Sequence, residues 1–147
     1  MSFEGAHELS LDAKYRITIP VRQREALTAG GGVVLTMHPD GCLLVYPKLT
    51  WDQMKAELMD IGSMAKESRD WQRLVVGHAD TQEVDGAGRV LVNPILRKRA
   101  SLESKAVFVG QGRHCEIWDP TRWDEAVNAA FATAAKGPPP GAEKFRL

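Results

Sequence analysis

Short apolar runs rich in β-branched residues alternate with longer stretches whose apolar positions recur every three or four residues. The runs RITI and RVLV are typical of strands, and Pro20 and Pro94, which follow them closely, suit the first turn of a short helix. Later apolar runs, joined in pairs by the turn sequences HPDG and GQGRH, predict hairpins. The predicted strands cover residues 16–19, 31–37, 41–46, 89–92, 105–110 and 114–118.

Longer helices are predicted after each hairpin, where the apolar spacing changes to three or four residues. Thr50 with Gln53, and Thr121 with Asp124, have the spacing of a capping box at the start of these two helices. A third amphipathic helix is predicted between them. The residues expected to face inward are Trp51, Met54, Leu58, Ile61, Trp71, Leu74, Val75, Trp123, Ala126, Val127, Ala130 and Phe131.

These elements occur twice in the same order. The Asp-x-x-x-Arg motif at residues 12–16 recurs at residues 85–89, an offset of 73 positions. One extra residue, Asn93, then shifts the offset to 74, so that Pro20 faces Pro94. We predict four segments, namely a first repeat at residues 5–60, a connecting helix at 61–76, a second repeat at 77–131 and a disordered tail at 136–147.

The size of the repeats bears on the fold. A unit of about 55 residues with three short strands and a helix buries little core by itself, so the two repeats are expected to share one core. The sequence therefore predicts an α+β fold in which both repeats form one barrel-like domain with internal pseudo-two-fold symmetry. The two motifs would then occupy related positions.

Composition narrows the possible classes of protein. Lys plus Arg and Asp plus Glu number 19 each, which argues against a strongly basic coat but allows a local basic patch. No apolar run has the roughly 18 to 20 residues of a membrane span, and the first residues do not resemble a signal peptide. Two cysteines without a CxxC motif predict neither a disulfide framework nor a zinc site, and a cytoplasmic protein is expected.

The two Asp-x-x-x-Arg motifs allow two interpretations. An arginine four residues after an aspartate can pair with it across a turn, and spacing alone favours such a structural ion pair. The other interpretation places Arg16 and Arg89 on a surface that contacts phosphates or bases, with Asp12 and Asp85 orienting them. Basic residues close to both motifs favour this second interpretation, although such runs are often solvated helix faces.

Catalytic sites are not supported by the sequence. Duplicated aspartates could suggest an aspartic protease, but Ala13 and Gly86 stand where that chemistry needs a hydroxyl residue. The four histidines lack metal-ligand spacing, and Cys42 and Cys115 open equivalent strands as small packing residues. We therefore predict no enzyme, no metal, no cofactor and no small-molecule substrate.

The motifs DAKYRITIP, CLLVYP, QRLVVGHA and DGAGRVLVNPILRKRA, between Phe3 and Trp123, resemble the MraZ family of bacterial transcriptional regulators in content and order. That family is related to the AbrB-like swapped-hairpin DNA-binding proteins. The resemblance implies a double-split β-barrel built from two AbrB-like repeats with flanking helices. It also implies a cytoplasmic, nucleoid-associated repressor that binds direct repeats in double-stranded DNA upstream of the division and cell-wall genes as a ring-like homo-oligomer.

The resemblance also implies the functional residues. Tyr15 stands where the family commonly has glycine, and Ala87 stands where a lysine would match the first motif, so the two motifs are expected to contribute unequally. Asp12 and Asp85 are expected to orient the arginines. The residues expected to contact DNA are Lys14, Arg16, Arg22, Arg24 and Arg89. The alternative is a non-catalytic oligomerisation module that binds a protein partner.

Overall fold

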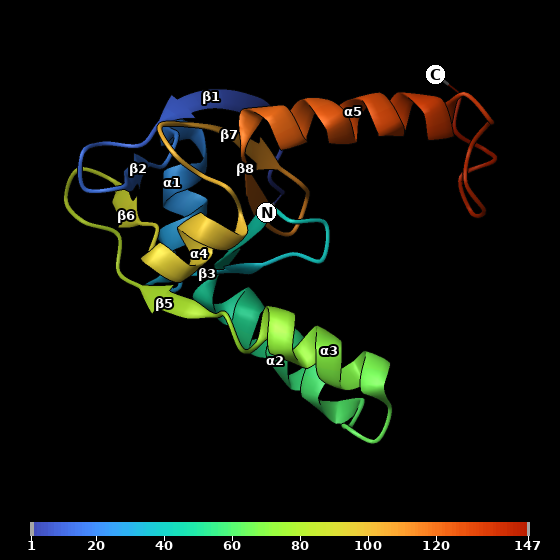
Figure 1. Cartoon of the computed structure of the whole chain (residues 1–147), viewed down its shortest axis with the longest axis horizontal. Coiled ribbons are helices and arrows are strands. Elements are labelled where there is room, and N and C mark those ends of the chain that lie inside the picture. The colour runs from blue at the N-terminus through green and yellow to red at the C-terminus, as the bar shows by residue number, and fades with distance from the viewer. Residues whose placement is uncertain (1, 147) are drawn as a thin grey trace.

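Residues 2–146 are described by a computed structural model, in which this part of the chain forms eight strands and five helices (Figure 1). The elements in chain order are β1 (Ala6–Ser10), β2 (Arg16–Thr18), α1 (Val21–Thr28), β3 (Val33–Met37), β4 (Leu43–Pro47), α2 (Lys48–Asp60), α3 (Lys66–Val75), β5 (Asp80–Gln82), β6 (Arg89–Leu91), α4 (Pro94–Arg99), β7 (Lys105–Gly110), β8 (Cys115–Trp118) and α5 (Pro120–Ala134). The six strands predicted from the apolar runs are all present.

The main sheet has the strand order β1-β7-β8-β4-β3-β5, and every pairing in it is antiparallel. Its outer strands are exchanged between the repeats, since β1 of the first repeat pairs with β7 of the second and β5 of the second pairs with β3 of the first. The order reads the same when the repeats are interchanged about the central β4–β8 pair. This arrangement has the pseudo-two-fold symmetry that the duplication predicts.

The prediction of a double-split β-barrel is not confirmed, whereas the α+β class is. The hydrogen-bonded sheet ends at β1 on one side and at β5 on the other, and β2 pairs only with β6 in a separate two-stranded ribbon. Within residues 2–146, the strand pairing therefore closes no barrel.

The exchanged strands β1 and β5 are absent from the sequence prediction. AHELS in β1 has only weakly apolar alternate positions, and DTQ in β5 is polar and three residues long. Their strand conformation depends on the edges of β7 and β3 that they pair with, and these edges come from the other half of the chain. Local sequence carries little signal for such a strand.

A single core joins the two repeats. The largest cluster of buried residues includes Ile17 and Leu35 from the first repeat together with Val90, Phe108 and Ile117 from the second. Phe108 is among the side chains with no exposed surface. Because neither repeat encloses these residues alone, the halves are expected to fold as one cooperative unit.

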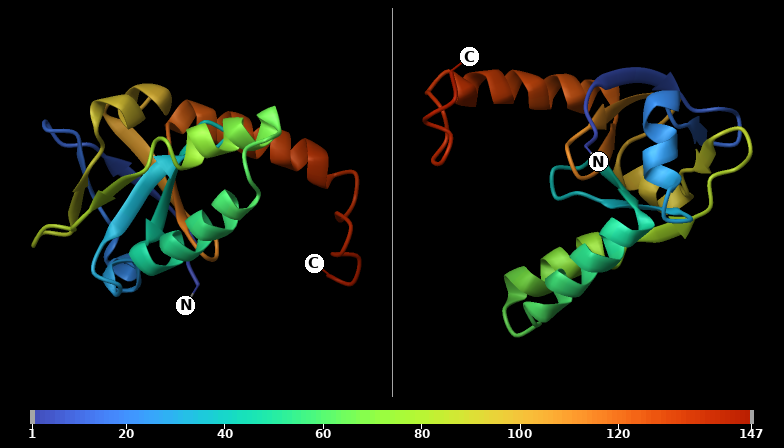
Figure 2. Two further views of the ribbon diagram at one scale, coloured as in Figure 1. Left: turned by 90° about the horizontal axis from the view of Figure 1, so that it is seen from below. Right: turned by 180° about the vertical axis from the view of Figure 1, so that it is seen from behind.

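The longer helices lie outside this core and project from the sheet (Figures 1 and 2). Trp51 of α2 and Val75 of α3 are buried in a cluster with Val34, so their predicted inward orientation is confirmed. The inward assignments of Trp71 and Phe131 are wrong, since these side chains are 53% and 72% exposed. Of the five helices in residues 2–146, none combines the length and apolar character that a membrane crossing requires.

The other incorrectly assigned inward positions are Ile61, which is 66% exposed, and Ala130, which is exposed. Ile61, directly after α2, and Ala130, in α5, lie where these helices project beyond the sheet. The helical spacing of apolar residues continues there, but no other element covers these side chains. Residues 135–146 follow α5 without helix or strand. The disordered tail at 136–147 stays a prediction, and residue 147 lies outside the described residues.

Helix starts differ from those predicted. The helix α2 begins at Lys48, with Pro47 before it, so that Thr50 lies inside the helix and caps nothing. The helix α5 is capped by Asp119, whose carboxylate accepts a hydrogen bond from the backbone nitrogen of Arg122 at 3.0 Å. In both cases a proline at the start of the helix places the N-cap before the predicted Thr cap, by three residues in α2 and by two in α5.

The N-caps of the short helices α1 and α4 show that the predicted alignment of Pro20 with Pro94 is wrong by one residue. Pro20 is the N-cap of α1, and its structural counterpart is Asn93, which is the N-cap of α4 and accepts a hydrogen bond from Leu96. Pro94 is the first residue of α4. The offset of 73 therefore continues through the short helices, and residues 24 and 97 are equivalent.

Gly110→Ala is expected to destabilise the protein by about 1–3 kcal/mol, the usual range for overpacking. A Cβ atom at Gly110 would overlap the backbone nitrogen of Glu4 and lie 2.6 Å from its Cα, where the segment before β1 runs beside the end of β7. Chemical denaturation measures the change. Gly86→Ala is the control, since a Cβ atom there meets nothing within 4 Å, and equal stability of the two variants would contradict the prediction.

Candidate functional site

The β2–β6 ribbon brings the two Asp-x-x-x-Arg motifs together. Its strands pair antiparallel, with Ile17 opposite Val90 and both side chains buried. Because side chains alternate across a strand, the neighbours of this buried pair point the other way. We call the outward surface the ribbon face, and it consists of Arg16, Thr18, Arg89 and Leu91.

The two motif loops lie at the same end of the molecule, opposite the far ends of α5 and of the α2–α3 hairpin (Figures 1 and 2). The loop at residues 12–15 precedes β2, and the loop at residues 85–88 precedes β6. The ribbon thus presents one arginine after each loop on a common face. Sequence spacing predicted the two pairs, and the strand pairing determines that they lie side by side.

In the first loop, the Asp12 carboxylate holds the turn closed. One carboxylate oxygen accepts hydrogen bonds from the backbone nitrogens of Lys14 and Arg16, both at 2.9 Å. The other accepts from Nε of Arg16 at 2.8 Å. A charge-assisted bond of this kind fixes the direction of the guanidinium as well as the turn.

The second loop repeats this geometry. Asp85 accepts hydrogen bonds from the backbone nitrogens of Ala87 at 3.0 Å and of Arg89 at 2.9 Å, and from Nε of Arg89 at 2.8 Å. The predicted ion pairs are therefore present in both repeats. Asp12 and Asp85 lie where the prediction of an orienting role requires them.

The two arginines keep hydrogen-bonding capacity toward solvent. Within residues 2–146, each guanidinium bonds its aspartate through Nε, and its terminal nitrogens donate to no protein acceptor. The side chains of Arg16 and Arg89 are 29% and 35% exposed. An oriented guanidinium with free terminal nitrogens can donate two parallel bonds to a phosphate or to a guanine edge.

The pKa of Asp12 is expected to rise toward its ordinary value of 3.8 in Arg16→Ala, without reaching it. The Arg16 backbone amide and its side chain both hydrogen-bond the carboxylate and lower its pKa, and the substitution removes only the side chain. Because the folded-state pKa is lowered, the stabilisation is present above the ordinary pKa and is lost as pH falls through the folded value.

A carboxyl-carbon NMR titration measures this pKa. Arg73→Ala is the matched control, because Arg73 pairs with Asp70 on α3, away from the loop. An unchanged Asp12 pKa in Arg16→Ala would show that the side-chain bond is absent in solution.

Tyr15 and Gly88, the residues immediately before the two arginines, have left-handed backbone conformations with φ of 61° and 80°. Each carbonyl accepts a hydrogen bond from the opposite repeat, Tyr15 from the backbone nitrogen of Val92 at 3.0 Å and Gly88 from that of Ile19 at 2.8 Å. Glycine adopts this conformation freely, whereas a tyrosine is strained there. The first loop therefore has the same backbone geometry as the second, but Tyr15 adopts it at a conformational cost.

The other predicted DNA contacts fall into two groups. Lys14 on the first loop and Arg22 on α1 have exposed side chains and stay predictions. Arg24 is turned inward, where a terminal nitrogen donates to the carbonyl of Ile19 at 2.9 Å and Nε is buried without a partner among residues 2–146. The structure brings together Arg16 and Arg89 but gives Arg24 protein partners.

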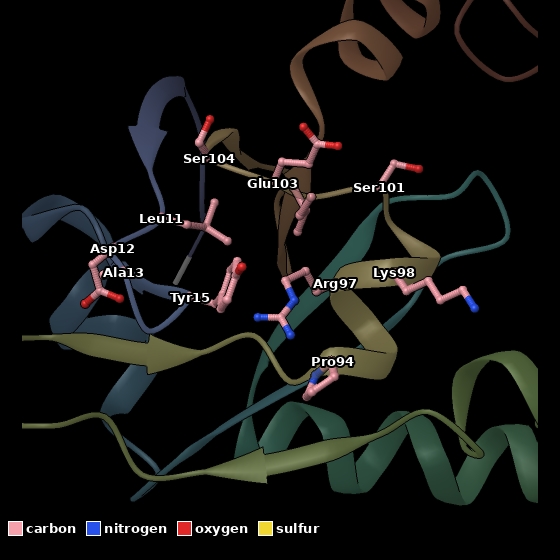
Figure 3. Close-up of a pocket in the computed structure, with 11 residues that line it drawn as sticks. Leu11, Asp12, Ala13, Tyr15, Pro94, Arg97, Lys98, Ser101, Glu103 and Ser104 are labelled. Carbon is pink, nitrogen blue, oxygen red and sulfur yellow. The ribbon is translucent and has the colours of Figure 1, made fainter.

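Arg97 is a functional candidate that the sequence prediction missed. Its Cζ lies 3.5 Å from the centre of the Tyr15 ring, beside an open hollow of about 940 Å³ between the first loop and α4 (Figure 3). An arginine over an aromatic face makes a favourable cation–π contact. The offset of 73 would have paired Arg97 with Arg24, but the apparent match of Pro20 with Pro94 concealed it.

Both cysteines are free and buried. Burial raises the pKa of the Cys115 thiol to about 12 and also raises the pKa of the Cys42 thiol, so neither sulfur is an activated nucleophile. Within residues 2–146, no group of three or more His, Cys, Asp or Glu side chains is placed to hold a metal ion.

Comparison with known proteins accounts for the duplicated loops. Residues 2–74 and residues 75–136 each match the MraZ protein family, so the two matches span nearly all of the chain. The chain belongs to the MraZ family. The paired matches agree with the duplication, and the Asp–Arg loops that resembled MraZ motifs in the sequence are the loops that flank the ribbon face.

Several MraZ proteins are similar to this chain over most of its length. The transcriptional regulator MraZ of Methylobacillus flagellatus is 40% identical over 147 residues, covering 99% of both chains. That of Azoarcus sp. (strain BH72) is 41% identical over 146 residues and also covers 99% of both. That of Acidovorax sp. (strain JS42) is 44% identical over 131 residues, or 88% of this chain and 90% of the relative.

Proposed function

We propose that the protein is a transcriptional regulator that binds double-stranded DNA through the ribbon face and its two loops. The observation that carries this proposal is the pair of oriented guanidinium groups, Arg16 and Arg89, on one exposed face. The name transcriptional regulator, borne by relatives that align along nearly the whole chain, supports it. Catalysis is not part of the proposed function.

The ribbon has the chemistry of a DNA-reading element. A two-stranded antiparallel ribbon is narrow enough to enter the major groove, and outward arginines on it can reach base edges or phosphates. Bonds to Asp12 and Asp85 hold these arginines before binding, so less side-chain freedom is lost when DNA is contacted. Lys14 on the first loop and Arg22 on α1 add exposed positive charge and contribute to phosphate binding in this proposal.

The net charge of zero favours binding by several copies together. A homo-oligomer, with the protomers in a ring, would place several ribbon faces along one duplex, and linked sites gain affinity from effective concentration. The α2–α3 hairpin and α5, on the side away from the loops, expose the apolar side chains needed for contacts between copies. These side chains are Met59, Ile61, Met64, Trp71 and Phe131.

The proposed target is a set of short direct repeats upstream of the division and cell-wall genes, including the protein's own gene, with repression as the outcome. Copies related by rotation within a ring meet DNA in the same orientation, which fits direct rather than inverted repeats. The proposed location is therefore the nucleoid.

Fluorescence anisotropy with labelled duplexes tests this function. DNA from immediately upstream of the coding region is compared with a shuffled duplex of equal length and composition, at several salt concentrations. We expect tighter binding to the upstream DNA and a linear fall of log affinity with log salt. Equal affinity for both duplexes at low salt would contradict the proposal and favour a module that binds a protein partner through its exposed helices.

A further inference from the structure

The helices α1 and α4 each direct one arginine at the motif loop of the opposite repeat. Arg24 and Arg97 are both the fourth residue of their helix, counted from Val21 and from Pro94. Arg97, in the second repeat, lies on Tyr15 of the first loop, while Arg24, in the first repeat, lies against Gly88 of the second. We propose that both are positioning residues that hold the loops in their DNA-binding conformation.

The two contacts occur at equivalent points of the loops. Tyr15 and Gly88 have left-handed φ values, and each directly precedes the arginine of its motif. Any movement of either residue is passed to the next one in the chain, which is Arg16 or Arg89. A guanidinium held over this point can therefore control the direction of the neighbouring arginine without contacting DNA.

The two contacts differ in chemistry. At the first loop, Cζ of Arg97 lies 3.5 Å from the centre of the Tyr15 ring, and both side chains line the hollow (Figure 3). At the second loop, the Arg24 guanidinium fills the space that a side chain at position 88 would occupy, since a Cβ atom there would overlap it. Arg24 is fixed in that place by its bond to the Ile19 carbonyl.

This arrangement explains how a tyrosine can stand at position 15, whose counterpart in the second repeat is Gly88. Gly88 needs no help to adopt its left-handed conformation, but Tyr15 does, and the cation–π contact favours the ring position that this conformation requires. The bond from the Val92 backbone nitrogen to the Tyr15 carbonyl then reports on whether the loop is held. The expected change in DNA affinity rests on the proposed DNA-binding function, whereas the expected change in hydrogen exchange at Val92 does not.

Arg97→Met tests the proposal, because it removes the charge while keeping an unbranched side chain. We expect DNA affinity to fall by about two- to fivefold, the worth of an exposed cation–π contact, with an unchanged dependence on salt. Without DNA, we expect faster hydrogen exchange at the Val92 amide. Arg97→Lys should show smaller losses of DNA affinity and of protection at the Val92 amide than Arg97→Met. Tyr15→Phe, which keeps the aromatic face, should leave DNA affinity and Val92 exchange unchanged.

Two further variants complete the experiment. Tyr15→Leu should reproduce the effect of Arg97→Met, and combining the two should add little, since both remove the same contact. Lys98→Met is the matched control for exchange at Val92, because Lys98 is the next residue of α4 and points away from Tyr15 (Figure 3). It should leave that exchange unchanged.

Three results would overturn the positioning role. A salt slope that falls by about 0.9 per contact in Arg97→Met would show that Arg97 binds a phosphate directly. Unchanged exchange at Val92 would show that Arg97 does not hold the loop. Additive losses in the double variant would show that Tyr15 and Arg97 act separately. Absence of specific DNA binding by the wild type would reject the proposed function, while Val92 exchange would still decide whether the loop is held.

Discussion

Arg16→Ala is expected to weaken binding to the upstream DNA by roughly ten- to hundredfold, as loss of one good arginine contact does. In the proposed function its terminal nitrogens are free for DNA, while Nε is held by Asp12. The loss should be larger for the upstream DNA than for a shuffled duplex if Arg16 reads bases. Fluorescence anisotropy with both duplexes measures this difference.

Arg73→Ala is the matched control for Arg16→Ala. Arg73 pairs with the nearby Asp70 at 3.3 Å, but it lies on α3, away from the ribbon face. It should bind DNA like the wild type. Both variants should keep their stability within about 1 kcal/mol, because exposed ion pairs contribute little. Wild-type affinity in Arg16→Ala would remove Arg16 from the DNA contact.

Phe108→Ala is expected to lower the free energy of unfolding by about 3–5 kcal/mol, the usual cost of removing a buried phenyl ring. Phe108 lies on β7 between β1 and β8, in the cluster that both repeats share. The loss should therefore affect both halves at once. Chemical denaturation at a fixed protomer concentration measures the change, since assembly makes apparent stability depend on concentration.

Ile95→Ala is the control for Phe108→Ala, because Ile95 is also a large apolar residue but is 63% exposed. Its effect should stay within about 0.5 kcal/mol, as is usual for exposed positions. Two separate transitions in the Phe108→Ala variant, with one at the wild-type midpoint, would contradict a core shared by the two repeats.

The candidate site was only partly predictable. The four-residue spacing of Asp12 and Arg16 is enough to predict an ion pair across a turn, because both groups belong to one short segment. The inward position of Arg24 is not predictable in this way. Its partners, the Ile19 carbonyl and the bare backbone at Gly88, include a residue of the other repeat.

The sequence alone determined the duplication, the strands with strong apolar runs and the turn-forming aspartates. These features depend on local spacing, on β-branched side chains and on hydrogen bonds within a few residues. The tertiary structure alone decided the exchange of β1 and β5 between repeats, the common face of Arg16 and Arg89, and the contact of Arg97 with Tyr15. These depend on pairing and packing between distant segments, which local patterns do not specify.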